Sequence, residues 1–324
     1  MENFLRDDPI SIENTEVSCK ITNIYGENFS DDEEEFPQKL YRIIIFGVTE
    51  DSNTVGITVH GFCPFFYLCV PNERQKTWNV YHTSCVEKYI RKKMYNFKWA
   101  LTEVKLVSMK KLYPFTNFEN FKFIKLSFCN TIAFHVVKKY FYNPVKISDI
   151  TQKSIFFELY ECNVDPLTRF TQCADILTAG WINVKSFSIN DDPVTTSQID
   201  ISTSWSDITH VENDTIAPVV IASFDIETFS ADACYKNISV FPNSSNPEDT
   251  VAQIGTTLWK YGTDEVLKHI VTMSDTHIPD KGDDFIIEVA ETEKELYEKW
   301  VSFLVKTNPD GYTGYNIFGY DWKY

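Results

Sequence analysis

The sequence predicts an α+β amino-terminal domain, residues 1–215, followed by a smaller α/β domain, residues 216–324. Short runs rich in Val, Ile, Tyr and Phe alternate with polar turns in the first domain, and helical periodicity interrupts them. A polar stretch rich in Ser, Thr and Asp, residues 186–214, then favours a linker. After it we expect three strands, a helix and a further strand, an order typical of an α/β sheet domain.

In the first domain, β-branched and aromatic residues cluster in six runs. These runs predict strands at residues 17–24, 40–48, 55–60, 65–70, 104–108 and 121–128. Apolar residues at helical spacing predict helices over residues 86–94 and 131–141. Residues 156–184 predict a strand, a short helix that begins at a proline, and a glycine turn.

The second domain begins with the apolar run PVVIASF, residues 218–224, which suits a strand buried on both faces. Further strands are predicted at residues 250–259, 268–273 and 311–316. Thr292 and Glu295 form a T-x-x-E capping box before an apolar stripe, so a helix should begin there and end at Asn308. A last helix is expected to begin near Ile317.

Charge is distributed unevenly along the chain. The net charge of −16 disfavours a nucleic-acid partner for the average surface. Residues 86–153 nevertheless contain 14 Lys/Arg and only 4 Asp/Glu. Taken alone, this basic segment is compatible with a solvated surface or with a surface that binds a polyanion.

The cysteines and the apolar runs indicate the compartment. Eight cysteines are scattered without a CxxC pair, which fits free thiols in a reducing environment. The longest apolar runs, residues 41–48 and 218–224, are far shorter than the roughly 20 residues of a membrane span. The first residues lack the apolar core of a signal peptide. We therefore expect an intracellular protein with no membrane segment.

The string SFDIETFS, residues 223–230, places Asp225 and Glu227 at the expected end of the apolar strand. Residues two apart in a strand point to the same face, so the two carboxylates can converge on one divalent cation. Phosphodiester hydrolysis uses such a site, because metals activate a water and neutralise the leaving alkoxide. In so acidic a chain a solvated pair is the simpler interpretation, but the buried strand before it favours a cation.

The string TGYNIFGYDWKY, residues 313–324, follows the capped helix and the short strand. Asn316 and Asp321 are five residues apart. With a helix beginning near Ile317, both side chains would face one cleft. By itself the string is explained equally well by a turn asparagine and a helix-start aspartate.

Together the two strings resemble the first and second exonuclease motifs of the family B DNA polymerases. The second motif matches as YNIFGYD, with Tyr320 where the family usually has Phe. Upstream, VHGFCPFFYLCVP, YECNVDPLTRF and AGWINV resemble amino-terminal segments of the same family. The resemblance covers nearly the whole chain. The matched strings are most similar to those of the delta-like enzymes and of the enzymes of large nucleocytoplasmic DNA viruses.

This resemblance implies a ribonuclease H-like exonuclease domain that is cut off after its second motif. It implies that Asp225, Glu227 and Asp321 are the catalytic, metal-binding carboxylates. It also implies DNA contacts for Asn316 and Tyr320, and two Mg²⁺ or Mn²⁺ ions in the complete site. The third exonuclease motif and all polymerase motifs would lie beyond residue 324, so the polypeptide itself is expected to be inactive.

For function, the resemblance implies a DNA-directed DNA polymerase with 3′ to 5′ proofreading. Its partners would be a DNA primer-template, a single-stranded 3′ end and a processivity factor bound through the remainder of the protein. It would act in the nucleus or at a viral replication site. A free-standing DEDD-type exonuclease, which does not need residues 1–215, stays open, as does a non-catalytic DNA-binding module based on residues 86–153. The sequence after residue 324 separates the three.

Overall fold

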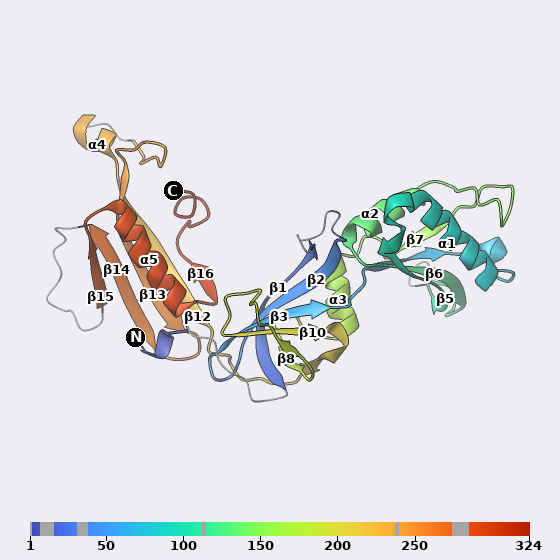
Figure 1. The fold of residues 1–324 in the computed structure, drawn as a ribbon, viewed down its shortest axis with the longest axis horizontal. Coiled ribbons are helices and arrows are strands. Elements are labelled where there is room, and N and C mark those ends of the chain that lie inside the picture. Colours follow the sequence, from blue (N-terminus) through green and yellow to red (C-terminus); the bar gives the residue numbers. More distant parts are fainter. Residues whose placement is uncertain (1, 7–15, 31–37, 112–114, 237–239, 274–284) are drawn as a thin grey trace.

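A computed structural model describes residues 2–6, 16–30, 38–111, 115–236, 240–273 and 285–324. The described residues form three units in a row, each built on its own β-sheet (Figure 1). We call them the carboxyl-terminal unit, the central unit and the distal unit. The central unit lies between the other two.

The central unit is a seven-stranded sheet in the order β11-β8-β1-β2-β3-β10-β9. Its strands are β1 (Val17–Phe29), β2 (Leu40–Val48), β3 (Thr54–His60), β8 (Trp181–Val184), β9 (Ser188–Ile189), β10 (Ile199–Ser204) and β11 (Ile208–Val211), with the 3₁₀ turn η4 (Trp205–Asp207). Helix α3 (Pro166–Ala174) buries Phe170 in the core of this sheet. Asp165 caps the helix by accepting hydrogen bonds from the backbone N–H groups of its first turn.

The predicted linker at residues 186–214 is wrong, because much of this stretch belongs to the central sheet. Strand β10 pairs in parallel with β3, and β11 pairs with β8. Polar side chains of this stretch find hydrogen-bond partners inside the fold. Asp200 is buried, and its carboxylate accepts hydrogen bonds from the backbone N–H and the hydroxyl of Thr195 at 2.7 and 2.6 Å.

The distal unit is a four-stranded sheet in the order β5-β6-β4-β7. Its elements are β4 (Phe65–Cys69), β5 (Leu101–Lys110), β6 (Asn120–Phe128), β7 (Glu158–Tyr160), α1 (Val80–Met94), α2 (Thr131–Tyr140) and the 3₁₀ turns η2 (Asn72–Arg74) and η3 (Tyr95–Ala100). Asn79 and Asn130 cap the two helices by accepting from the backbone N–H of the third helical residue. This unit has its own hydrophobic core, separate from the central one. The segment predicted as one amino-terminal domain therefore contains two cores.

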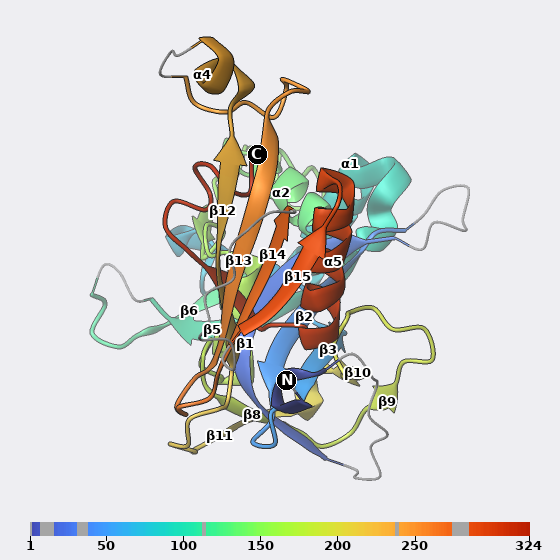
Figure 2. The ribbon, with the colours of Figure 1, turned by 90° about the vertical axis from the view of Figure 1, so that its left-hand side faces the viewer.

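The carboxyl-terminal unit is a five-stranded sheet in the order β15-β14-β13-β12-β16. Its elements are β12 (Val220–Phe229), β13 (Thr250–Lys260), β14 (Val266–Met273), β15 (Phe285–Ala290), β16 (Gly311–Thr313), α4 (Ala231–Lys236) and α5 (Glu293–Thr307). Strands β12, β13 and β14 are antiparallel, whereas β16 is parallel to β12 and β15 is parallel to β14. Figure 2 shows the long strands β12 and β13 side by side, with α4 beyond the end of β12.

Strand β12 differs from the predicted strand in two respects. It is buried on one face only: Val220, Ala222 and Phe224 are buried, while Ser223 and Asp225 between and after them are exposed. It also continues to Phe229, so the acidic pair lies within the strand and not at its end. The buried face packs beneath α5, whose residues Leu296 and Phe303 share the same hydrophobic clusters.

Helix α5 begins and ends where the sequence predicts. The backbone N–H of Glu295 donates to the Thr292 hydroxyl at 3.2 Å. The Glu295 carboxylate accepts instead from the N–H of Glu291 at 2.9 Å, so the capping box is shifted by one residue on that side. Asn308 ends the helix in the left-handed conformation.

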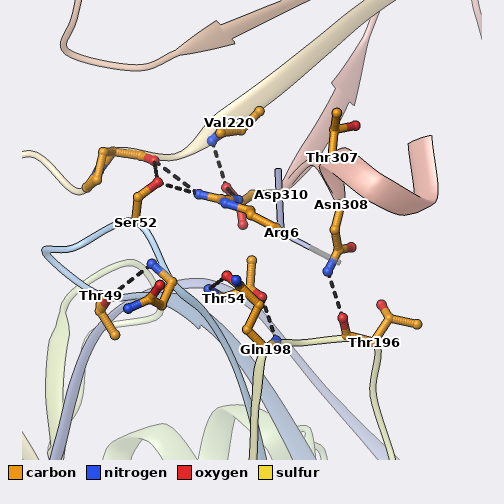
Figure 3. A network of polar contacts seen from close by, with 12 residues as sticks. Arg6, Thr49, Ser52, Thr54, Thr196, Gln198, Val220, Thr307, Asn308 and Asp310 are labelled. Carbon is orange, nitrogen blue, oxygen red and sulfur yellow. Dashed lines mark hydrogen bonds and ion pairs between the residues drawn. The ribbon is translucent and has the colours of Figure 1, made fainter. Parts of the chain in front are cut away.

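An ion pair near the amino terminus joins the carboxyl-terminal unit to the central unit (Figure 3). Arg6 contacts Asp310 at 2.7 Å and the Ser52 hydroxyl at 2.8 Å, and the two charged side chains are only 4% and 5% exposed. Asp310 also accepts a hydrogen bond from the Val220 backbone at 2.6 Å. Phe4 is buried beside the start of β12. The first described residues therefore pack on the carboxyl-terminal sheet.

Candidate functional site

Asp225 and Glu227 lie on the exposed face of β12, opposite the face that α5 covers. Their spacing of two residues in a regular strand places both carboxylates on the same side. Across the strand pair Asp225 faces Gly255, where an added side-chain carbon would have no described residue within 4 Å. The pairing register between β12 and β13 shifts directly after Glu227. The two carboxylates thus border open space beside an irregular point in the sheet.

Asp321 reaches the same place from the end of the chain. Its Oδ1 accepts a hydrogen bond of 3.2 Å from the backbone N–H of Ile226, the residue between the two strand carboxylates. The segment that carries it comes close to β12 because Gly314 has no side chain: a Cβ there would lie 2.5 Å from the Phe224 carbonyl oxygen. The structure therefore brings all three predicted carboxylates together.

The predicted helix near Ile317 is wrong. Residues 317–323 form consecutive hydrogen-bonded turns in which Tyr320 N–H donates to Asn316 O at 3.0 Å and Trp322 N–H to Ile317 O at 2.9 Å. Asn316 has a φ of +56°, a left-handed conformation that departs from a helix. Asp321 is consequently held by its bond to β12 and by the packing of Trp322 on Phe224 at a centroid distance of 5.0 Å.

The carboxylates influence one another electrostatically. Partial loss of hydration, and then the negative charges of Asp321 and Glu227, raise the pKa of the Asp225 carboxyl above its ordinary value of 3.8. Asp225 and Asp321 are also close enough to share a hydrogen bond when one of them is protonated. Such a cluster concentrates negative charge, which a bound cation would neutralise.

The donor atoms suit a hard divalent cation. Carboxylate oxygens are the ligands that Mg²⁺ and Mn²⁺ prefer, and Mg²⁺ commonly keeps several waters beside one or two carboxylates. Within the described ranges, no group of three or more His, Cys, Asp or Glu side chains lies in an arrangement that could hold a metal ion. Asp225 and Glu227 therefore suit an ion that two carboxylates bind and that keeps its other ligands as water. Asp321 lies beside them, with one oxygen hydrogen-bonded to the backbone.

The two predicted DNA-contacting residues take different positions. The Tyr320 hydroxyl forms a hydrogen bond of 2.8 Å with the Thr228 hydroxyl on β12, and its ring meets the edge of Phe241 at 5.8 Å. Asn316 is exposed, and its backbone carbonyl accepts from Gly319 and Tyr320. The structure thus places Tyr320 next to the acidic strand, whereas the Asn316 side chain lies against Gly319, where an added Cβ would be 2.1 Å from Asn316 Oδ1.

Sequence reasoning missed Asp249, which organises the loop beside this site. Asp249 is 7% exposed, and its carboxylate accepts from Ala231 N–H at 3.0 Å, Asn243 N–H at 2.8 Å and the Asn246 amide at 3.0 Å. These hydrogen bonds hold the ends of the loop that contains Phe241. The exposed ring of Phe241 contacts the Tyr320 ring. A single aspartate in a polar loop carries no periodic signal, so no pattern in the sequence marked it.

Comparisons with known proteins identify relatives along the chain. The family model described as DNA polymerase family B, exonuclease domain, matches residues 157–324, just over half of the chain. The chain is 28% identical over 316 residues to a DNA polymerase of Acanthamoeba polyphaga mimivirus, with 93% of this chain and 17% of that protein covered. It is 26% identical over 300 residues to the DNA polymerase delta catalytic subunit of Drosophila melanogaster, with 86% and 26% covered. The chain therefore spans about a quarter or less of these two relatives.

Among solved structures, the family B DNA polymerase from the hyperthermophilic archaeon Pyrobaculum calidifontis has a similar fold. The TM-score is 0.59 at 14% identity, with 94% of this chain and 31% of that chain covered. At this level of identity the match concerns the fold alone. In the part of the chain that the structure describes, no helix is long and apolar enough to cross a membrane.

Proposed function

Because this chain belongs to family B of the DNA polymerases, we propose that it is the amino-terminal part of a DNA-directed DNA polymerase with a 3′ to 5′ proofreading exonuclease. The observation that carries the proposal is the convergence of Asp225, Glu227 and Asp321 within the segment matched by the exonuclease model. Convergent carboxylates on an exposed strand suit metal-assisted hydrolysis of a phosphodiester.

We assign a ribonuclease H-like arrangement to the exonuclease, residues 216–324, and place the amino-terminal domain in residues 1–215. The ribonuclease H-like arrangement is supported by three antiparallel strands, β12 to β14, a fourth strand β15 parallel to β14, helix α5, and strand β16 parallel to β12. The packing of Phe4 and Arg6 on the carboxyl-terminal sheet gives the two proposed domains a common junction.

In the proposed reaction, Asp225 and Glu227 hold the divalent ions of the complete site, and Asp321 provides a third carboxylate. Two bound Mg²⁺ or Mn²⁺ ions would supply an acidified water and stabilise the leaving oxygen. The protein must keep Asp225 deprotonated for this role, although its neighbours raise its pKa. The open space beside Gly255 leaves room for the phosphate.

The DNA contacts follow from the same geometry. Tyr320, fixed to β12 through Thr228, offers a ring for stacking on a frayed base, and the exposed Asn316 offers an amide for hydrogen bonding. The substrate would be a primer-template and its single-stranded 3′ end, in the nucleus or at a viral replication site. A processivity factor would bind through the remainder of the polymerase.

Residues 1–324 alone should hydrolyse DNA poorly. Three carboxylates, one of them tied by one oxygen to a backbone N–H, leave the ions under-coordinated. A free-standing exonuclease is the less favoured function, because the similarity to polymerases extends through 93% of the chain and includes the segment before the exonuclease model. A non-catalytic DNA-binding module would not need the carboxylate convergence.

The test uses the complete polymerase. Asp225→Ala with Glu227→Ala should abolish degradation of a mismatched primer while leaving nucleotide addition largely intact, because the hydrolytic site is built in a unit separate from the polymerase. Both activities are measured on one labelled primer-template, with Asp264→Ala as an exposed acidic control. Equal loss of extension and degradation would show that the two activities are not separable.

A further inference from the structure

The distal unit carries a basic face that the exonuclease chemistry does not use. Helices α1 and α2 expose Lys88, Lys92, Lys93 and Lys139, and two tyrosines follow the helix ends, Tyr95 and Tyr142, exposed by 80% and 53%. We call these six residues the α1–α2 basic face. Within the described ranges, none of its four lysines has a carboxylate at ion-pair distance.

The carboxyl-terminal ends of the two helices lie side by side, so the basic residues of both ends are close together. The Lys93 ammonium lies 5.0 Å from the centroid of the Tyr89 ring and 5.1 Å from that of Tyr140. The Tyr140 hydroxyl donates to the Lys93 carbonyl at 3.5 Å, and Tyr89 contacts Phe141 at a centroid distance of 6.2 Å. Figure 1 shows both helices on the same side of the distal sheet.

Stability of the fold explains only part of this surface. Cations in the last turn of a helix complement its dipole, which accounts for Lys92, Lys93 and Lys139. Lys88 lies before that turn. Tyr95 is exposed although its φ is +28°, a costly conformation for a residue with a large side chain. Unneutralised lysines beside exposed tyrosines therefore indicate a ligand that is anionic and aromatic.

We propose that the α1–α2 basic face binds single-stranded nucleic acid, as a second contact for the DNA on which the proposed function acts. Lysines neutralise phosphates, and exposed tyrosines stack on bases. A duplex hides the faces of its bases inside the helix, so Tyr95 and Tyr142 favour a single strand. This face and the carboxylates of β12 lie in units at opposite ends of the molecule (Figure 1). A strand held here is held away from the hydrolytic site.

The test measures fluorescence anisotropy of a labelled oligothymidylate of about 15 nucleotides with residues 1–324 in EDTA. Lys88→Gln/Lys92→Gln/Lys139→Gln should bind about 10-fold more weakly and reduce the salt slope by about 2, since each lost single-strand phosphate contact contributes roughly 0.7. Tyr95→Ser should weaken binding roughly 10-fold with an unchanged salt slope, because stacking releases no counterions.

The matched control is Lys185→Gln/Lys294→Gln/Lys306→Gln, which removes the same charge from exposed lysines of the other two units. An equal loss of affinity in the control would overturn the proposal, because net charge alone would then explain binding. Equal affinity for a duplex of the same length would also overturn it. Metal-assisted hydrolysis does not proceed in EDTA, so this binding measurement is independent of the proposed exonuclease, and failure of the one and failure of the other give different results.

Discussion

His269 shows at the scale of one residue how burial sets a pH dependence. Its ring is fully buried and stacks on Phe303 at a centroid distance of 3.8 Å. Nε2 contacts Glu288 at 2.9 Å, and Nδ1 has no hydrogen-bond partner among the residues that the structure describes. Burial lowers the pKa of His269 below 6.5, although Glu288 acts in the opposite direction. The folded chain therefore favours the neutral ring.

The consequence is a loss of stability in acid. A lowered folded-state pKa contributes stability that is present above the unfolded pKa of 6.5 and is lost as the pH falls through the folded value. The melting temperature should therefore decrease below about pH 6.5, and less steeply in His269→Gln. His210→Gln, an exposed control, should follow the wild type. Parallel curves for wild type and His269→Gln in thermal melts would contradict this account.

The pH dependence that Asp225 gives to stability has the opposite sign to that of His269. Its pKa is raised in the folded state, so its ionisation disfavours folding above the ordinary pKa of 3.8. Asp225→Asn should melt at a higher temperature than the wild type at pH 7 without divalent cations, and Mg²⁺ should narrow that difference. Asp264→Asn, on an exposed turn, is the control. A lower melting temperature of Asp225→Asn in EDTA would show that the carboxylates do not repel one another.

At the scale of elements, the Arg6–Asp310 pair joins an amino-terminal segment to the loop before β16. Arg6→Ala should reduce the free energy of unfolding of the carboxyl-terminal unit by about 3–5 kcal/mol, because it leaves a buried carboxylate without its cation. Arg91→Ala, which removes the partly exposed pair with Glu87, should cost at most about 1 kcal/mol. Denaturant titration measures both changes.

The double variant Arg6→Ala/Asp310→Asn separates pairing from packing. Its loss should be smaller than the sum of the single losses, because the unpaired buried charge is gone. Additive losses would mean that the two side chains act independently.

Most elements could be predicted because apolar periodicity and capping signals coincide. Strand β2 and helix α5 show this most clearly: Thr292 and Asn308 mark the ends of the helix. Strand β10 was missed because polar partners satisfy Asp200 inside the sheet, which no local pattern reveals. Strand β15 was also missed: its short run, FIIEVA, is mostly exposed or half-buried, and it forms a strand by pairing in parallel with β14.

The sequence was enough to predict which carboxylates come together, but not the backbone conformation that brings Asp321 to the other two. The spacing of Asp225 and Glu227 defines a common face wherever a strand forms. The expected helix near Ile317 failed because a left-handed Asn316 and the close approach of Gly314 to β12 replace it with turns. The position of Asp321 depends on a hydrogen bond to Ile226, a contact 95 residues apart in sequence.

At the scale of the whole molecule, three sheets with separate cores lie in a row (Figure 1). The motifs that indicate family B are distributed over all three, which is why their order carried the resemblance. The carboxylates lie at one end, and the α1–α2 basic face lies at the other. We propose that Asp225 and Glu227 hold the cation and that Asp321 is the third carboxylate of the same site.

The most direct test of that claim is Mn²⁺ binding to residues 1–324, followed by electron paramagnetic resonance. The wild type should bind Mn²⁺ with a saturable affinity that is weakened in Asp321→Ala and lost in Asp225→Ala/Glu227→Ala, because carboxylate oxygens are the expected ligands. Asp264→Ala should bind as the wild type does. Undiminished Mn²⁺ binding by Asp225→Ala/Glu227→Ala would contradict the account.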